Sequence, residues 1–137
     1  MNGLKRKPPW LSHAGRQLRE QIDDRYPNRD RRSDGWVADS KHSKKSDHSP
    51  RRNGVVRAID IDAGLGHSKA SGMLALAIVE AAKAGDKRIK YVIHKGRIAS
   101  KIRGWAWRPY TGLNPHETHI HVSFTRKGDR DRSNFAI

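Results

Sequence analysis

Hydrophobic residues recur at helical spacing in two stretches of the chain. The first stretch contains Leu18 and Ile22, follows a suitable N-cap at Ser12 and stops at Pro27. This pattern predicts an amphipathic helix over residues 13–25, whose apolar side would cover a sheet.

The second stretch lies between Ser68, the predicted N-cap, and Gly85, the residue that would end it. It predicts a helix over residues 69–84, because small and apolar residues there recur every three or four positions. We expect its core-facing side to consist of Met73, Leu74, Ala77, Ile78 and Ala81.

Period-two alternation and β-branched residues indicate strands elsewhere. One strand is predicted over residues 55–62, and another over residues 118–125. Residues 89–94 and 97–100 flank a Lys-Gly pair and predict a β-hairpin. The order of helix, loop, strand, helix, hairpin and strand predicts a small single α+β domain with a central, mainly antiparallel sheet and flanking helices.

The 137 residues have room for one modest core. We divide the chain into a basic lead-in (1–10), the folded domain (11–125) and a charged C-terminal tail (126–137) that we expect to fray. Between residues 28 and 53 the chain is long and polar, with only Trp36 and Val37 to bury, and a loop of that length indicates function or disorder.

The chain is strongly basic along its whole length. Lys and Arg outnumber Asp and Glu by 29 to 14, giving a net charge of +15 that both halves of the chain share. Such a surface favours polyanionic partners: nucleic acid, anionic lipid or an anionic cell-wall polymer. With no cysteine in the chain, a metal ion would need His, Asp or Glu ligands.

The chain has no apolar segment long enough for a membrane span. Its first ten residues lack the apolar region of a signal peptide, and the longest apolar run, near residues 73–82, is too short for a bilayer. We therefore expect a protein made in a cytoplasm without a signal peptide. A monomer is also expected.

Histidines and aspartates mark the candidate chemistry. His119 and His121 lie on the same face of the last predicted strand, and Asp60 and Asp62 share a face of the earlier one. His48 stands near the end of the long polar loop. One His from the loop, one Asp from an early strand and one His from a late strand would make a mixed N/O set of three ligands, the number that catalytic zinc sites use.

Three motifs in this order give the chain a family resemblance. They are Ser46-Asp47-His48, Ala58-Ile59-Asp60-Ile61 and His116-X-X-His119-X-His121. The sequence from about residue 18 to 124 resembles the LAS group of zinc peptidases (lysostaphin, D-Ala-D-Ala peptidase, Hedgehog). Within that group it is most similar to the M15 peptidoglycan peptidases of phage endolysins. It departs from many M15 enzymes in its longer spacing, because eleven residues separate His48 from Asp60, with a bulging loop expected at residues 51–53.

The resemblance implies a function and a ligand set. It implies an α+β zinc peptidase that cleaves an amide bond in the stem or cross-bridge of bacterial peptidoglycan, with Zn²⁺ held by His48, Asp60 and His121. Asp60 is preferred to Asp62 because it holds the family's Ala-X-Asp-Ile position. Such an enzyme would act on the cell wall after release through a membrane lesion, with peptidoglycan and anionic wall polymers as partners.

The identity of the catalytic base stays open at this stage. Strand alternation would put Glu117 on the face of His119 and His121, whereas the family motif favours His119, with His116 in support. A turn at Pro115 could bring His116 towards the site. We rank His119 first, His116 second and Glu117 third.

Other residues have weaker assignments. Arg29 lies where related enzymes place a substrate-binding Arg, although a solvated charge run explains it equally well, and Ser46 would hold the His48 loop by a hydrogen bond. His42 would line the cleft or be exposed. Three more histidines are expected at the surface: His13, His67 and His94. Core or rim positions are favoured over a substrate platform for Trp105, Trp107 and Tyr110.

Two other functions fit the same composition. A basic nucleic-acid-binding protein or a His/Asp metal-dependent nuclease would suit the charge, but the aromatic residues do not interleave with the basic ones as a stacking platform would. A catalytically silent LAS-like binding domain is the third interpretation. A catalytically silent domain would not need to keep all the metal motifs and His119, but this chain has all of them.

Overall fold

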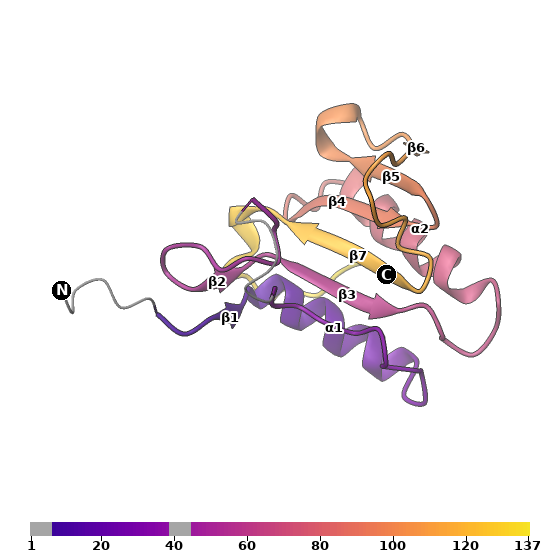
Figure 1. Cartoon of the computed structure of the whole chain (residues 1–137), viewed down its shortest axis with the longest axis horizontal. Helices are drawn as coiled ribbons and strands as arrows, with labels where there is room; N and C mark the ends of the chain where they lie inside the picture. Colours follow the sequence, from indigo (N-terminus) through magenta and orange to yellow (C-terminus); the bar gives the residue numbers. More distant parts are fainter. Residues whose placement is uncertain (1–6, 39–44) are drawn as a thin grey trace.

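The computed structural model describes residues 7–38 and 45–137, and it has the predicted α+β architecture. Five strands form an antiparallel sheet in the order β3-β7-β4-β5-β6 (Figure 1). The strands are β3 (Ala58–Asp62), β4 (Ile89–His94), β5 (Arg97–Ser100), β6 (Arg108–Pro109) and β7 (His119–Phe124). A short parallel pair, β1 (Trp10–Leu11) and β2 (Val55–Val56), lies beside this sheet.

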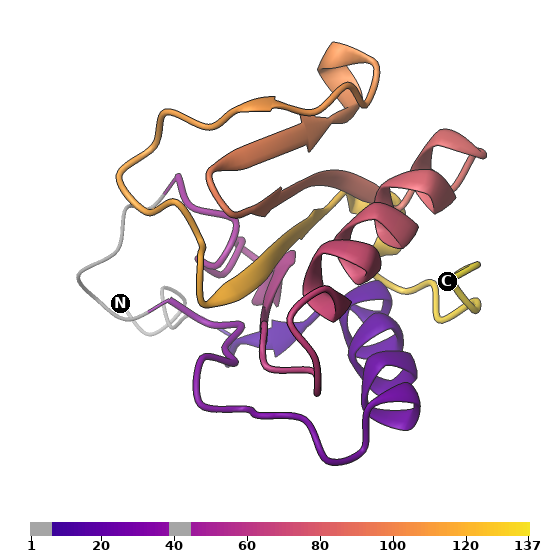
Figure 2. The ribbon, with the colours of Figure 1, turned by 90° about the vertical axis from the view of Figure 1, so that its right-hand side faces the viewer.

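Both α-helices cover the same face of the sheet. Helix α1 (His13–Arg25) contacts β3, and α2 (Ala70–Lys83) contacts β4 and β7 (Figure 2). Two short 3-10 helices, η2 (Lys101–Arg103) and η3 (Arg126–Gly128), follow β5 and β7. The core lies between the α-helices and the alternate residues of β3 and β7 that face them, which are Ile59, Ile61, Ile120, Val122 and Phe124.

The other face of the same two central strands is polar. Asp60 of β3 pairs in register with His121 of β7, and Asp62 pairs with His119. Because side chains alternate along a strand, burying the Ile and Val residues against the helices turns these four residues to the opposite face. The hydrophobic pattern of the two strands thus fixes the position of the candidate site.

Helix α1 matches its prediction closely. It covers His13–Arg25, and the hydroxyl of Ser12 accepts a hydrogen bond from the amide of Gly15 at 3.2 Å. Leu18 and Ile22 are fully buried, as the spacing predicts.

Helix α2 occurs where predicted, but two details were wrong. Its N-cap is Lys69, which makes no capping hydrogen bond through its side chain, so Ser68 is not the cap. Met73 is 59% exposed, whereas Leu74, Ile78 and Ala81 are buried as predicted. The buried side also includes Ala75 and Val79, which were not predicted. In an Ala-rich helix several apolar stripes are nearly equivalent, and contact with the sheet selects the one that lets the small residues approach closely.

The strand predicted over residues 55–62 is divided at Arg57. Val55–Val56 pairs in parallel with β1, whereas Ala58–Asp62 pairs with β7. The Arg57 side chain forms a two-fold ion pair with Asp129, at 2.7 and 2.8 Å. The break lets one continuous segment serve two separate pairings.

The prediction that residues 126–137 fray is wrong. Phe135 is only 3% exposed and packs in the core near Phe124, with ring centroids 6.5 Å apart. Its backbone is hydrogen-bonded on both sides by Gln21, and the Arg88 guanidinium lies 3.7 Å from its ring centroid. A buried aromatic residue thus joins the polar contacts of the segment, such as Arg57–Asp129, in fixing it to the domain.

We expect a Phe135→Ala variant to lose roughly 3–5 kcal/mol of unfolding free energy, because truncating a buried aromatic removes its burial and leaves a cavity. Urea unfolding measures the change. Arg132→Ala is the matched control in the same segment, since its ion pair with Glu20 is solvent-exposed and contributes less than about 1 kcal/mol. Equal stability of both variants would show that the segment is not part of the core.

Candidate metal centre

The structure brings together three residues that lie far apart in the sequence: His48, Asp60 and His121. Asp60 and His121 face each other across the pairing of β3 with β7, and His48 reaches them from the loop before β2. One potential ligand atom from each residue lies within 4.8 Å of the others. The group has the composition and spacing of a metal-binding set.

The facing atoms can be named. His48 Nε2 lies 3.2 Å from Asp60 Oδ2, and His121 Nδ1 lies 3.1 Å from Asp60 Oδ1. The two imidazole nitrogens, His48 Nε2 and His121 Nδ1, are themselves 3.1 Å apart. Two ring nitrogens and a carboxylate therefore converge on one small region.

The outer nitrogen of each imidazole is already engaged. His48 Nδ1 lies 2.8 Å from the backbone carbonyl of Trp36, which can only accept, so Nδ1 carries the hydrogen. His121 Nε2 lies 2.7 Å from Ser123 Oγ. Ser123 also hydrogen-bonds the carboxylate of Asp47, and this bond helps to lower the pKa of Asp47 against the effect of its burial.

These outer partners suit histidines that turn their inner nitrogens to a metal. The Ser123 hydroxyl oxygen can accept from a hydrogen on His121 Nε2, as the Trp36 carbonyl accepts from His48 Nδ1–H. In these tautomers the lone pairs of His121 Nδ1 and His48 Nε2 point inward. Two such lone pairs beside a carboxylate repel one another unless a cation lies between them, and outer partners of this kind are typical of metal-ligating histidines. The residues therefore fit a bound metal ion.

The pKa shifts of Asp60, His121 and His48 are also compatible with a bound cation. Burial disfavours the charged carboxylate of Asp60. When no metal holds the inner nitrogens, hydrogens on His121 and His48 can bond to this carboxylate instead, and these bonds outweigh burial and hold the Asp60 pKa far below its usual value. Burial lowers the pKa of His121 and outweighs the opposing effect of Asp60. Burial also acts to lower the pKa of His48, but the hydrogen bond to Asp60 raises it overall. Without a metal, a proton on His48 would occupy the position that a cation could take.

Backbone contacts position the His48 loop. Ser46 Oγ accepts from the His48 amide at 3.2 Å, which is the hydrogen bond predicted for Ser46. The His48 carbonyl accepts from the Ala38 amide at 2.8 Å, while Gly35 forms a β-bridge with Asp60. The extra residues 51–53 form a turn closed by bonds between Arg51 and Val55 and between Gly54 and Arg51, so the long spacing does not displace His48.

His116 and His119 lie beside this set. His119 Nε2 is 3.7 Å from Asp60 Oδ1, and the His116 and His119 rings have centroids 4.8 Å apart. The φ of His116 is +59°, so a turn after Pro115 folds its ring to within 5.3 Å of the His121 ring centroid. Together with Asp60 these two histidines form a second group whose ligand atoms lie within 4.8 Å of one another.

His116 has an unusual environment for a polar ring. Its Nδ1 is buried and has no hydrogen-bond partner within residues 7–38 and 45–137. Burial, together with the neighbouring His121 and His119, lowers the pKa of His116 to about 4. The ring is therefore neutral at pH 7 and can offer a lone pair.

Glu117 is not on the face predicted for it. Strand β7 begins only at His119, so alternation does not extend back to Glu117, and its side chain is exposed. The turn that brings His116 inward accounts for this difference. Of the three candidates for the base, His119 and His116 adjoin Asp60.

His94 was wrongly predicted to be a surface residue. It is buried, and its Nδ1 donates to the backbone carbonyls of both His116 and His119 at 3.1 Å. Its Nε2 lies 3.0 Å from Ser71 Oγ on α2. His94 thus connects the helix layer to the turn that holds two candidate catalytic histidines. Only its position two residues after the core residue Val92 on the same strand could have indicated this from the sequence.

Arg29 is engaged in structural ion pairs. Its guanidinium, 1% exposed, pairs with Asp23 at 2.8 Å and with Asp34 at 2.6 Å. Asp34 in turn accepts a hydrogen bond from the amide of Asp62, the end of β3. A substrate carboxylate would have to displace these partners to reach Arg29, so this substrate-binding prediction gains no support from the geometry.

The aromatic residues occupy core and rim positions. Trp105 and Trp107 are partly buried against the core, and the ring centroid of Tyr110 lies 5.8 Å from that of His116. Tyr91 was not singled out from the sequence, yet its ring stacks on His121 with centroids 5.4 Å apart. Of the remaining histidines, His67 is exposed and His13 half-buried, and His42 lies outside the described residues.

We expect Ser123→Ala to weaken zinc binding about 10- to 100-fold, because it removes the partner that holds His121 Nε2–H. Competition with a chromogenic chelator measures the affinity. Ser100→Ala, another buried serine of the sheet, is the matched control because its hydroxyl contacts Arg108. An unchanged affinity in Ser123→Ala would show that the hydroxyl does not set the tautomer.

Among the described residues, no helix is both long and apolar enough to cross a membrane. Comparisons of the chain with protein-family models, with curated proteins and with solved structures found no match.

Proposed function

We propose that this chain is a zinc-dependent peptidase that hydrolyses an amide bond in bacterial peptidoglycan peptides, in the manner of a phage endolysin. One observation carries the proposal: the inner nitrogens of His48 and His121 converge on Asp60 while their outer nitrogens are held by other partners. This arrangement offers two imidazole nitrogens and a carboxylate oxygen to one cation.

Zinc is the metal that suits the donor set best. Two imidazole nitrogens and one carboxylate oxygen match the ligands that catalytic zinc sites use, and three protein ligands leave a coordination position open. When bound, zinc supplies Lewis-acid chemistry: it polarises a carbonyl and lowers the pKa of water to roughly 7.

His119 is the proposed catalytic base. Its Nε2 faces Asp60 at 3.7 Å, and its Nδ1 is 3.3 Å from the Thr118 hydroxyl, so Nε2 is positioned to hold a proton taken from water and return it to the leaving amine. His116, held inward by the turn after Pro115, would support the developing negative charge on the carbonyl oxygen. His94 would position both through their backbone carbonyls.

The substrate class is supported by the family resemblance and by charge. The three motifs that carry the resemblance include all the residues of the metal group, and His119 and His116 as well. The net charge of +15 would attract the enzyme to walls that carry carboxylate and phosphate groups. Which amide bond is cut is the first question for experiment.

Purified bacterial cell walls digested with the metal-loaded protein provide the test. Mass spectrometry of the released muropeptides should show products that differ from intact ones by the addition of one water at a single amide bond. Walls that release no new amino termini, from hosts of several wall chemotypes, would contradict the proposal. Cleavage of DNA or RNA by the same preparation would instead favour the metal-dependent nuclease predicted as the alternative.

A further inference from the structure

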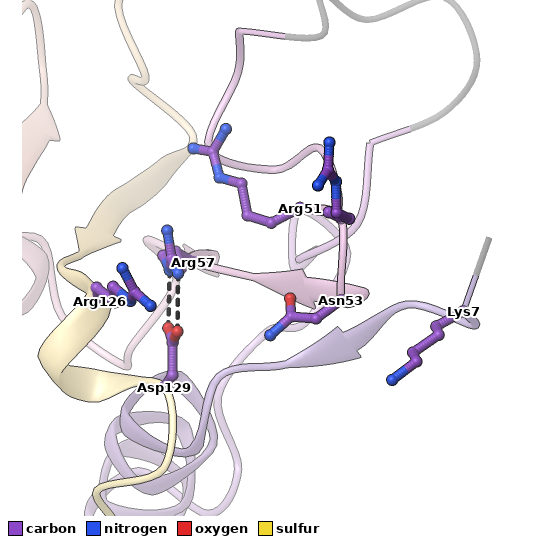
Figure 3. A pocket seen from close by; sticks show the side chains of 7 residues that line it. Lys7, Arg51, Asn53, Arg57, Arg126 and Asp129 are labelled. Carbon is purple, nitrogen blue, oxygen red and sulfur yellow. Dashed lines mark hydrogen bonds and ion pairs between the residues drawn. The ribbon is translucent and has the colours of Figure 1, made fainter. Parts of the chain in front are cut away.

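A basic cavity lies apart from the metal-binding residues, where the segment before β1 meets the turn before β2. Its volume is ≈ 570 Å³. Figure 3 shows the side chains that line it. The cationic residues lining it are Lys7, Arg51, Arg52, Arg57 and Arg126. Asn53 and Asp129 also line it, and Asp129 is the one acid among the described lining residues.

Most of this positive charge is not neutralised. Asp129 is occupied by Arg57, with the paired contacts seen in Figure 3, and Arg51 pairs with Asp47 at 2.6 Å. Lys7, Arg52 and Arg126 have no ion-pair partner among the residues that the structure describes. The Nε of Arg51 is also buried without a hydrogen-bond partner in that part of the chain. An anionic ligand would satisfy these groups.

The wall of the cavity is preformed. Trp10 N donates to Gly54 O at 2.9 Å, and Trp10 Nε1 donates to Asn53 O at 3.0 Å, joining the two segments. Gly54 has φ +91°, and a Cβ built there would lie 2.5 Å from Pro8 O, so only glycine allows this close approach. Little ordering is then required when a ligand binds.

The described lining lacks the aromatic features that single-stranded nucleic acids use for binding. Among the described residues, no aromatic side chain lines the cavity, and the nearby Trp10 ring is covered by Arg130, whose guanidinium carbon lies 4.9 Å from its centroid. Single-stranded nucleic acids depend on aromatic stacking for much of their binding, which this surface does not offer. The cavity lining instead offers positive charge and hydrogen bonding to phosphate.

We infer that this cavity binds the phosphate groups of a base-free polymer of the kind that bacterial walls carry. The choice of a wall polymer rests on the proposed function, whereas the recognition of phosphate rests on the cavity itself. Such a site would hold the enzyme on its substrate.

The test measures binding of a labelled poly(glycerol phosphate) oligomer by fluorescence anisotropy at several salt concentrations. We expect R52Q/R126Q to weaken binding about 10-fold or more and to reduce the salt slope by roughly 1 to 2, since two phosphate contacts are lost. The control is K101Q/R103Q, which removes the same charge from η2, near the opposite edge of the sheet, and should change binding less than about twofold (Figure 1).

Equal losses in both double variants would overturn the inference, because they would indicate diffuse attraction to the whole surface. Tighter binding of a single-stranded DNA oligonucleotide with the same number of phosphates, lost in R52Q/R126Q, would also overturn it in favour of a nucleic-acid site. Chelation of the metal should leave polymer binding unchanged, and R52Q/R126Q should keep its zinc. The experiments therefore distinguish a lack of phosphate binding at the cavity from a lack of zinc-dependent peptidase activity.

Discussion

A His121→Ala variant is expected to lose its zinc and all detectable wall hydrolysis. The substitution removes one of three ligands and leaves His48 and Asp60 as a pair, so zinc affinity should fall by more than about 100-fold, beyond the loss that an outer partner alone would cause. Metal analysis of the purified variant and amino-group release from walls measure the two losses.

His67→Ala is the matched control for this prediction, because His67 is an exposed histidine outside both metal-binding groups. It should keep about one zinc per chain and full activity. His48→Ala should reproduce the defects of His121→Ala from a different segment of the chain, with circular dichroism to show that both variants are folded. Normal zinc content in either ligand variant would contradict the ligand assignment.

His119→Ala is expected to keep its zinc but lose about 10²- to 10⁴-fold in activity, the range that a positioned acid-base group contributes. The physical reason is that His119 adjoins Asp60 without belonging to the His48, Asp60 and His121 group. Zinc content separates this variant from the ligand variants, and kcat on a soluble muropeptide gives the size of the loss.

Two neighbouring variants rank the three candidates for the base. Glu117→Gln should change activity by less than about twofold, as for most exposed positions away from a site. His116→Ala should give an intermediate loss with normal zinc content. A large loss in Glu117→Gln together with an active His119→Ala would reverse the ranking and restore the assignment that strand alternation suggested.

The sequence was sufficient to predict the elements that depend on local pattern. Ser12 and the Leu18/Ile22 spacing located α1, and alternation in β3 and β7 placed Asp60 and His121 on one face. That face is determined because the opposite residues, such as Ile59 and Val122, must be buried against the helices. The fold class follows from the same reasoning.

Features that depend on tertiary contacts were missed or wrongly predicted. The hydrogen-bond partners of His94 are backbone carbonyls 22 and 25 residues away and a hydroxyl on α2, and no local pattern reveals them. Phe135 is held by Gln21 and Arg88, and Met73 is exposed because the Ala-rich side of α2 fits the sheet more closely. Tyr91, which stacks on His121, becomes visible only once the pairing of β4 with β7 is known.

The most direct test of a zinc-dependent wall peptidase is amino-group release from purified cell walls by one preparation in three states: as purified, after chelation, and after zinc is returned. Our account predicts release by the first, little by the second, and recovery when one zinc per chain has been restored. Undiminished release after complete removal of the metal would contradict it.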